Sequence, residues 1–400
     1  MGFFSASEVD SSPGNSTIPQ CGACQLHKEC QSPKMAVTGE GQKGILVVAE
    51  APGKTEDERG VQLVGKAGQE LREALSALGC DLDRDCWKTN AVICRPEDNK
   101  LNERCIEYCR PNIVKAIDDL NPRVIILLGG AAVRSVIGLE QSKVGELGRW
   151  VGWTIPLQSR NVWLCPTYHP SYLLRSNSPV LSMWFRKHLE KALGLLGRPW
   201  NDVPDYLQQI TVEISPEKAA AMIRSATARS DGPIAFDYET DRLKPDHPDA
   251  EIVSCAICWE GKKTLAYPWT PETAAATSEV LRSPVPKYGA NIKFEQRWTK
   301  AKLGHEVKGW RWDCMQAAHV LDCRRGITSV KFQAHVRLGQ ADWSQKVAPY
   351  LKATGGNRKN RIRQVPMRDL LLYNGMDALI EFITAIHQMN EMEEFNGTAC

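Results

Sequence analysis

The sequence ILVVAEAPG at residues 45–53 decides the fold of the first half of the chain. Five apolar residues, three of them β-branched, are followed at once by a turn that contains Pro52 and Gly53. A second run of the same kind, VIILL at residues 124–128, ends at Gly129. Continuous apolar runs of this length are typical of parallel strands that are buried on both faces. The sequence therefore predicts an α/β domain built on a parallel sheet.

Helical patterns and turns extend this domain beyond the two strands. Residues 67–78 place apolar side chains at helical spacing, residues 162–164 predict a further strand, and residues 181–196 predict a closing helix. Residues 197–208 (GRPWNDVPDYLQ) contain two prolines and no periodicity, which indicates a linker. We therefore place the first domain at residues 21–196.

Length and composition narrow the classes of protein that the chain can belong to. Its 400 residues predict two to three domains at roughly 100–200 residues each. The formal charge of +3, from 50 basic and 47 acidic residues, names no partner by itself. The chain contains no run of about 18 apolar residues, so we expect no membrane span. Residues 1–20 lack the features of a secretory signal and predict a disordered leader. Because the chain has 14 cysteines and no such signal, we expect a reducing, cytoplasmic compartment.

Four cysteines form two pairs that lie far apart in the sequence. Cys21 and Cys24 make a C-x-x-C in a polar segment, and Cys94 and Cys109 stand on either side of an Arg-Pro turn and a short helix. Thiolates that converge from two such places can hold an iron–sulfur cluster or a zinc ion.

Polar residues follow the predicted strands, where ligands bind in open α/β folds. Glu50 directly follows the first strand, Glu56 comes six residues later, and Asn90 offers an amide that can both donate to and accept from a base edge. The stretch GVQLVGK at residues 60–66 imitates a phosphate-binding P-loop. Ala67 replaces the Ser or Thr that such a loop needs, and no strand directly precedes it, so we exclude a nucleotide triphosphatase.

The stretch HPSYLLR at residues 169–175 completes an ordered set of motifs. The set also contains the four cysteines, EAPG at residues 50–53, VGKAG at 64–68, Asn90, and CRP at 94–96. This set resembles family-4 uracil-DNA glycosylases over most of residues 21–195. The resemblance implies a three-layer α/β/α glycosylase-like domain that excises uracil or a related damaged base from DNA.

The resemblance also implies a cofactor and the roles of single residues. A [4Fe–4S] cluster would be bound by Cys21, Cys24, Cys94 and Cys109, whereas Cys30 and Cys105 have no counterpart and zinc remains the chemical alternative. Glu50 and Glu56 take the positions of the family's catalytic and water-handling carboxylates, and Asn90 that of the amide that reads uracil. His169 is expected to donate to O2 of the departing uracil, which gains negative charge as the glycosidic bond breaks.

Residues that contact DNA and the base pocket follow from the same resemblance. Lys66 and Arg175 are expected to contact the DNA strand, and Arg175 to help hold the base outside the helix. This chain has Ala49 where the family's first motif opens with Gly, and Leu63 where the family has an aromatic residue that stacks on the flipped uracil. Base–aromatic stacking is worth about 1–3 kcal/mol, so we expect binding weakened about ten- to a hundredfold and an altered rather than inactive glycosylase.

The second half begins with a strand at residues 211–214 and a helix at 216–228. The strand at residues 234–237 leads into DYET, where Asp237 and Glu239 face the same side because residues two apart on a strand do so. Two neighbouring carboxylates are costly without a cation, which indicates a divalent metal site. Residues 251–259 and 263–268 predict a hairpin.

Two further blocks complete the acidic set. NIKFE ends at Glu295, and Tyr373 and Asp377 stand four residues apart on one predicted helix face. The ordered set resembles the DEDD-type 3′–5′ exonucleases of the tyrosine subgroup, like the proofreading domains of A-family DNA polymerases, over residues 209–390. The resemblance implies a ribonuclease-H-like domain with a mixed sheet at residues 209–400.

The exonuclease resemblance implies two Mg²⁺ or Mn²⁺ ions. Asp237, Glu239 and Asp377 would hold the ion that activates water, and Asp237 would bridge to a second ion supported by Glu295. Two such ions stabilise the attacking and leaving oxygens of an in-line displacement. Tyr373 would orient the water. The family usually has Asp where this chain has Glu295, which extends the reach by one methylene and predicts a shifted rate or metal preference.

The leading hypothesis is a bifunctional DNA repair enzyme that serves a separate DNA polymerase subunit in a bacterial cell or a phage-infected host. Its DNA would contain uracil, or single-stranded or frayed 3′ ends. In the alternative hypothesis the exonuclease is active, and the first half is a catalytically weakened glycosylase-like module, marked by Leu63, that binds DNA or senses uracil. A scaffold without activity is disfavoured because carboxylates repel phosphate unless metals intervene. The basic loop TGGNRKNRIR at residues 354–363 is either solvated or in contact with phosphates.

Overall fold

The computed structural model of the chain describes residues 18–141, 143–198, 204–229 and 232–397. The chain divides into two compact units, residues 1–203 and 204–400. Residues 1–17 of the predicted leader and residues 199–203 of the predicted linker lie outside the described residues. The last residues of that linker form the short 3₁₀-helix η6 (Tyr206–Gln209).

A five-stranded sheet forms the centre of the described part of the first unit, in the order β2-β1-β3-β5-β4. The strands are β1 (Ile45–Ala49), β2 (Cys86–Asn90), β3 (Val124–Leu128), β4 (Ile155–Leu157) and β5 (Val162–Thr167). All neighbours run parallel except β4, which pairs antiparallel with β5. The predicted parallel sheet is therefore confirmed except at this edge. The edge strand contains Pro156, whose missing N–H is tolerated at the edge of a sheet.

Helices cover both faces of this sheet. On one face, α3 (Lys66–Ser76), α6 (Pro170–Ser176) and α7 (Pro179–Leu193) pack on Ile45 and Val47. The other face carries α5 (Gly129–Val136), which packs on β1 and β3. The remaining helices of the unit are α1 (Cys21–Cys24), η1 (Leu26–Lys28), α2 (Lys54–Arg59), η2 (Glu97–Asn99), α4 (Glu103–Leu120), η3 (Ile137–Leu139), η4 (Leu147–Arg149) and η5 (Gln158–Arg160). This is the expected three-layer arrangement.

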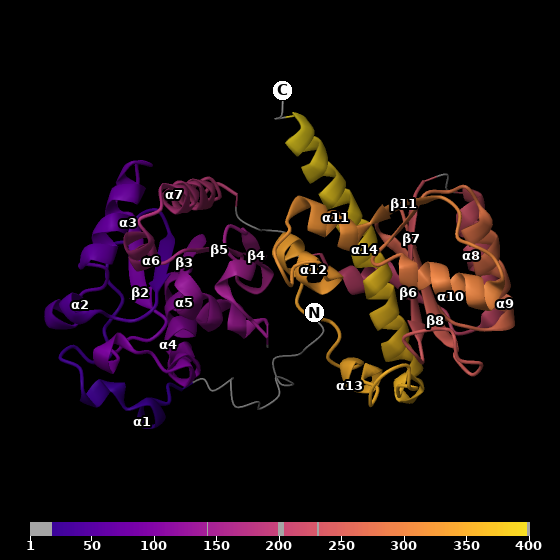
Figure 1. Cartoon of the computed structure of the whole chain (residues 1–400), viewed down its shortest axis with the longest axis horizontal. Helices are drawn as coiled ribbons and strands as arrows, with labels where there is room; N and C mark the ends of the chain where they lie inside the picture. The colour runs from indigo at the N-terminus through magenta and orange to yellow at the C-terminus, as the bar shows by residue number, and fades with distance from the viewer. Residues whose placement is uncertain (1–17, 142, 199–203, 230–231, 398–400) are drawn as a thin grey trace. The chain divides into compact units, whose positions relative to one another are not determined.

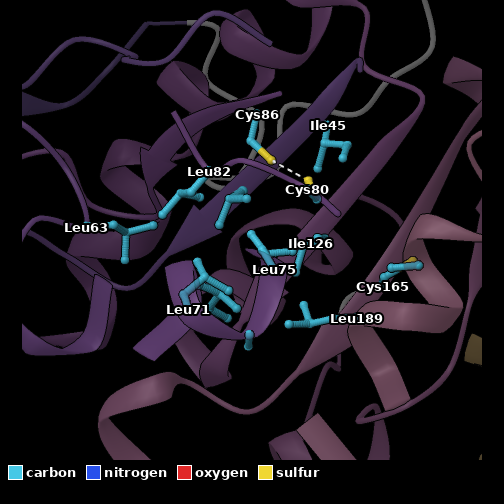
Figure 2. Packing of buried hydrophobic residues seen from close by; sticks show 14 of the residues in the cluster. Ile45, Leu63, Leu71, Leu75, Cys80, Leu82, Cys86, Ile126, Cys165 and Leu189 are labelled. Atoms are coloured by element: carbon cyan, nitrogen blue, oxygen red, sulfur yellow. Dashed lines mark hydrogen bonds between the residues drawn. The ribbon is translucent and has the colours of Figure 1, made fainter. Parts of the chain in front are cut away.

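The core beneath α3 and α7 also holds three thiols of the first unit. The sulfurs of Cys80 and Cys86 lie 3.8 Å apart inside this apolar cluster, near Ile45 (Figure 2). Leu63 lies at one end of the cluster drawn there, with Leu189 and Cys165 toward the other. Cys80, Cys86 and Cys165 are thus buried and pack as small apolar side chains.

A six-stranded mixed sheet forms the centre of the described part of the second unit, in the order β11-β10-β7-β8-β9-β6. The strands are β6 (Ile210–Val212), β7 (Ile234–Thr240), β8 (Ile252–Trp259), β9 (Lys263–Pro268), β10 (Lys287–Gly289) and β11 (Trp310–Asp313). The predicted hairpin is confirmed, because β8 and β9 pair antiparallel. The strand predicted to end at Asp237 continues to Thr240, because its polar residues pair with β8.

The two faces of β7 have different coverings. Ile234, Phe236 and Tyr238 pack with α8 (Pro216–Arg229), α9 (Pro271–Arg282) and α10 (Lys293–Leu303). Ala235 packs with the long helix α14 (Met367–Gly397), which runs along the other side of the sheet (Figure 1). The remaining helices are α11 (Cys314–Leu321), α12 (Val330–Leu338), α13 (Ala348–Leu351) and η7 (Ile362–Gln364). Strand alternation thus turns Asp237 and Glu239 toward α14.

Membrane-spanning helices were sought across the described residues of both units. None of these helices combines the length and the apolar content that a bilayer crossing requires.

Two candidate active sites

The first candidate site lies at the carboxyl edge of the parallel sheet. Ala49 of β1 pairs with Asn90 of β2, so Glu50 leaves the sheet beside Asn90. On the other side of β1, β3 ends at Leu128 and pairs there with Thr167 of β5, two residues before His169. Glu50, Asn90 and His169 therefore lie at or just after the carboxyl ends of three strands, at one edge of the sheet. Such an edge is where open α/β sheets bind their ligands.

Asn90 carries an unused hydrogen-bond donor in this edge. The residue is 2% exposed. Its amide nitrogen Nδ2 is buried and has no hydrogen-bond partner among the described residues. A buried polar group without a partner costs about 1–3 kcal/mol, so it indicates a missing partner with an acceptor.

His169 is held in one tautomer at the start of α6. Its Nδ1 accepts the backbone N–H of Ser171 at 3.2 Å, and a backbone N–H can only donate. The proton of a neutral ring therefore sits on Nε2. Burial, with a further contribution from the Arg175 charge, lowers the pKa of His169 to about 4. His169 is thus a neutral donor at neutral pH.

Glu56 anchors the loop that carries Leu63. Its Oε1 accepts the backbone N–H groups of Val64 at 3.1 Å and Gly65 at 2.7 Å. Leu63 has a positive φ of 55° and is 5% exposed, with its side chain in the core cluster. A Cβ on Gly68 would lie 1.9 Å from the carbonyl oxygen of Leu63, so only glycine allows this close approach.

The two residues expected to contact DNA lie on the surface of the first unit. Lys66 is the first residue of α3 and Arg175 lies in the last turn of α6, and both are exposed. Neither side chain is held by an ion pair among the described residues. Both are therefore available to an anionic partner.

The four predicted cluster cysteines lie close to one another in the first unit. Cys21 and Cys24 form α1, which packs against α4, the helix of Cys109. The backbone N–H of Lys34 donates to Cys94 Sγ at 3.2 Å, and the Asn112 amide donates to Cys109 Sγ at 3.3 Å. Donors of this kind stabilise thiolates.

The sulfurs need a cation to become thiolates. Burial raises the pKa of Cys94 to about 12 and also raises that of Cys109. The nearby Cys30 and Cys24 contribute to these rises, which places Cys30 beside the predicted set. Across the described residues, no three of these sulfurs lie within 4.8 Å of one another.

The second candidate site joins β7 to α14. Asp237, Glu239 and Asp377 each offer a carboxylate oxygen, and these three oxygens lie within 4.8 Å of one another. Burial, together with the charges of neighbouring carboxylates, raises the pKa values of Asp237 and Glu239 well above the ordinary range. A divalent cation would relieve both costs, because it neutralises the charge and supplies the ligands that water no longer provides.

Two further carboxylates lie behind this triad. Glu295 is in the first turn of α10, and Glu381 is one helical turn beyond Asp377 on α14. Both are buried, and one oxygen of each has no hydrogen-bond partner among the described residues. Burial and the charge of Asp237 raise the pKa values of both. The predicted Glu295 therefore lies near the triad, and Glu381 was not predicted because a single Glu on a helix resembles a surface residue.

Three other residues hold the triad in place and were also missed from the sequence. The Asn374 amide donates to Asp237 Oδ2 at 2.7 Å. Trp343 Nε1 donates to Asp377 Oδ1 at 3.0 Å. Lys331 Nζ lies 3.1 Å from the Tyr373 hydroxyl and 3.3 Å from Asp377 Oδ1. Asn374 could have been noticed because it follows Tyr373, whereas Lys331 and Trp343 reach the site only through tertiary packing.

Lys331 is a charged ammonium in spite of its environment. Burial alone would lower its pKa, but the charges of Asp377 and Glu239 outweigh burial and raise the pKa. Its Nζ also lies 5.0 Å from the ring centroid of Trp343 and 4.9 Å from that of Tyr373, within cation–π range. Tyr373 is thereby fixed beside the acidic triad.

Comparison with known protein families divides the chain at the same place as the fold. Residues 36–194 match the family described as the uracil DNA glycosylase superfamily, and residues 208–392 match the family described as 3′-5′ exonuclease. The type-4 uracil-DNA glycosylase of Pyrobaculum aerophilum is 40% identical over 182 residues, which cover 44% of this chain and 90% of that protein. The enzyme of the same name from Thermotoga maritima is 33% identical over 185 residues, 45% of this chain and 91% of that protein.

Solved structures similar to this chain include the POL domain of Pol1 from M. smegmatis in complex with DNA primer-template and dNTP. It is 15% identical, with a TM-score of 0.32. The match covers 46% of this chain and 28% of the polymerase chain.

Proposed function

We propose that this chain, which belongs to the uracil-DNA glycosylase superfamily through residues 36–194, removes uracil from DNA. We also propose that its 3′-5′ exonuclease domain at residues 208–392 digests DNA from 3′ ends. The two reactions use separate sites. The first breaks a glycosidic bond, and the second hydrolyses a phosphodiester. Uracil-containing DNA and single-stranded or frayed 3′ ends are the proposed substrates.

The unpaired amide of Asn90 supports the glycosylase proposal most directly. A flipped uracil presents an acceptor, O4, next to a donor, N3–H, which an amide matches with both of its groups. His169 would donate Nε2–H to O2 as negative charge develops there, and its low pKa keeps the ring neutral for that task. Glu50 would position the attacking water. Glu56 uses Oε1 to hold the pocket loop, which leaves Oε2 for a water molecule.

A [4Fe–4S] cluster held by Cys21, Cys24, Cys94 and Cys109 is the proposed cofactor of the first unit. The resemblance of the four cysteines to those of family-4 uracil-DNA glycosylases and the N–H groups directed at Cys94 and Cys109 support it. When bound, such a cluster would tie α1 to α4 and to the segment after β2, and base excision requires no electron transfer. Visible absorption and iron analysis of anaerobically purified protein test this assignment, and stoichiometric zinc without iron would refute it.

Hydrolysis by the second unit is proposed to use two Mg²⁺ or Mn²⁺ ions. Asp237, Glu239 and Asp377 would bind one ion, and Asp237 and Glu295 would support the other. The ions would supply charge stabilisation for the in-line displacement. Of the protein groups, Tyr373 would direct its hydroxyl at the attacking water, while Lys331 and Asn374 keep Tyr373 and Asp237 in position. The convergence of three buried carboxylates supports this proposal most directly.

A single labelled oligonucleotide tests both activities. Incubation of a uracil-containing strand without divalent ions, followed by alkali, should give one cleaved product at the uracil. Addition of Mg²⁺ should give a ladder that shortens from the 3′ end. Asp237→Ala should abolish the ladder alone, and a ladder that persists in this variant would refute the metal site.

A glycosylase half that senses uracil without efficient excision is the second candidate function. Leu63 favours it, because the side chain lies in the core and supplies no aromatic face. If the larger ring of Leu63→Phe turns out of the core toward the base, uracil excision should rise about ten- to a hundredfold, the scale of one stacking contact. Selective binding of uracil DNA over thymine DNA by the wild type, with no abasic product when enzyme is in excess, would establish the sensing role.

A separate DNA polymerase subunit is the proposed partner. The resemblance of residues 209–390 to proofreading domains supports this partnership. Co-purification of the tagged chain with a polymerase from its host, resistant to nuclease treatment, would support it, and recovery of the chain alone would contradict it.

A further inference from the structure

The loop of residues 354–363, called the basic loop below, is fixed to the segment that leaves β7. The backbone N–H of Asn360 donates to the carbonyl of Asp241 at 2.8 Å, and its side-chain amide donates to the carbonyl of Thr240 at 3.0 Å. Asn357 exchanges two hydrogen bonds with the backbone of Lys244, at 2.8 and 3.0 Å. The basic loop is therefore built onto the end of the strand that carries Asp237 and Glu239.

Two ion pairs add to this attachment and use part of the charge. Lys359 Nζ lies 3.0 Å from Oδ2 of Asp241, a carboxylate that is 0% exposed. Arg363 pairs with Glu251. These two cations are compensated, Lys359 by a carboxylate of the segment that leaves β7 and Arg363 by one that directly precedes β8.

Four cations of the same surface have no such compensation. Across the described residues no carboxylate pairs with Arg242, Lys244, Arg358 or Arg361. Arg358 and Arg361 bind only neutral oxygens, those of Thr354 and Pro349, at 3.3 and 3.0 Å. Arg242 binds the carbonyl of Asn357 at 2.9 Å. Cations gathered in this way repel one another unless an anion lies between them.

We propose that Arg358 and Arg361, with Arg242 and Lys244, bind backbone phosphates of the DNA strand whose 3′ end occupies the exonuclease site. The proposal rests on the proposed exonuclease function and names the part of the substrate that this surface holds. Guanidinium groups suit it because they bind phosphate with two parallel N–H bonds. Arg361 also lies over the ring of Tyr350, 5.7 Å from its centroid, which keeps its fork extended at the surface.

The distance along β7 sets which phosphates are reached. Asp241 is four residues beyond Asp237, about 13 Å at roughly 3.3 Å per strand residue. A nucleic acid strand advances about 3.4 Å per nucleotide when stacked and further when extended. The basic loop should therefore hold phosphates about two to four nucleotides on the 5′ side of the bond that is cleaved.

A ladder of substrate lengths tests the proposal with the full chain and Mn²⁺. Wild-type kcat/KM should rise from a dinucleotide to a strand of about six nucleotides and then level off. In R358Q/R361Q the ratio of kcat/KM for a 20-nucleotide strand to that for a dinucleotide should fall about tenfold. The slope of log KM against log salt concentration for the long strand should fall by about 1.4, because each lost phosphate contact lowers it by about 0.7.

The matched control is K218Q/R282Q, which removes two exposed cations of the same unit that have no carboxylate partner among the described residues. Its length ratio and salt slope should equal those of the wild type. Circular dichroism melting confirms that both double variants fold. If the wild type cleaves both substrates and R358Q/R361Q keeps the wild-type ratio and slope, the phosphate site is refuted. If the wild type cleaves neither substrate, the exonuclease proposal itself fails.

Discussion

At the scale of single residues, both sites contain side chains that have a shifted pKa or a hydrogen-bond donor without a partner. Asn90 holds a donor without a partner, His169 stays neutral, and Glu239 is buried close to two other acids. The unpaired amide and the clustered acids are costly in a protein without a ligand, whereas the low pKa of His169 keeps its ring neutral over a wider pH range. Perturbed pKa values and unpaired polar atoms beside the strand ends mark both places as candidate functional sites.

His169 gives a pH prediction for the glycosylase. Because its pKa is lowered to about 4, the ring is neutral above that pH, and excision should show no inflection near 6.5 that belongs to His169. Since the folded pKa lies below the unfolded one, the stability contributed by the neutral ring is lost as pH falls from about 6.5 to 4. NMR titration of the ring measures this directly, and a midpoint near 6.5 would contradict the account. Arg175→Gln should raise the midpoint, because it removes one positive charge.

Gly68 gives a prediction for the pocket loop. In Gly68→Ala the new Cβ would meet the backbone of Leu63 at 1.9 Å, so the loop must move. We expect a loss of about 1–3 kcal/mol in the free energy of unfolding of the first unit and loss of uracil excision. Gly130→Ala is the control, because nothing lies within 4 Å of its Cβ. Equal melting temperatures and excision rates for the two variants would refute this role.

At the scale of elements, the sequence predicts what depends on local pattern. The runs at residues 45–49 and 124–128 form buried strands, and the period of two on β7 puts Asp237 and Glu239 on the face toward α14. The strand β2 (CWKTN) was not predicted, because it mixes polar and apolar residues although nearly all of it is buried. Its burial follows from its parallel neighbour β1 and from the antiparallel bridge between Thr38 and Lys88, contacts that no local pattern encodes.

The contact between α12 and α14 gives a prediction about Lys331. In Lys331→Met the Tyr373 hydroxyl loses its partner, and one positive charge leaves the acidic site. We expect kcat of exonuclease to fall about 10–100-fold, the scale of a misplaced group, while Mn²⁺ binds more tightly. Calorimetric Mn²⁺ titration and single-turnover digestion measure the two effects. Lys331→Arg should restore the metal affinity of the wild type, and weaker Mn²⁺ binding in Lys331→Met would contradict the account.

The junction of β7 and α14 also predicts how metal affects stability. The pKa values of Asp237, Glu239 and Glu295 are raised in the metal-free fold. Their protonated carboxyls therefore contribute stability that is fully present below about pH 4 and is lost as pH rises through the folded pKa values. The second unit should therefore melt at lower temperature as pH rises. Mn²⁺ at a hundred times its Kd should restore about 2.7 kcal/mol. Asp237→Asn should lose that gain, and an equal gain in this variant would refute the metal assignment.

At the scale of the whole molecule, two units with separate cores carry separate chemistry. The motifs for both could be predicted because each lies in one short stretch, such as the HPSYLLR of residues 169–175 or the Tyr373–Asp377 pair. The residues that hold those motifs in place could not be predicted. Trp343 and Lys331 reach Asp377 across 34 and 46 positions of the chain, and only the folded structure shows that contact.

We propose that one chain carries two independent activities on DNA. The most direct measurement is a single gel of a labelled, uracil-containing strand, with and without Mg²⁺, for the wild type, Asp237→Ala and Asn90→Ala. The account predicts that Asp237→Ala loses only the magnesium-dependent 3′ ladder and that Asn90→Ala loses only the alkali-sensitive break at uracil. Loss of both activities in either correctly folded variant, or a uracil break that requires Mg²⁺, would contradict it.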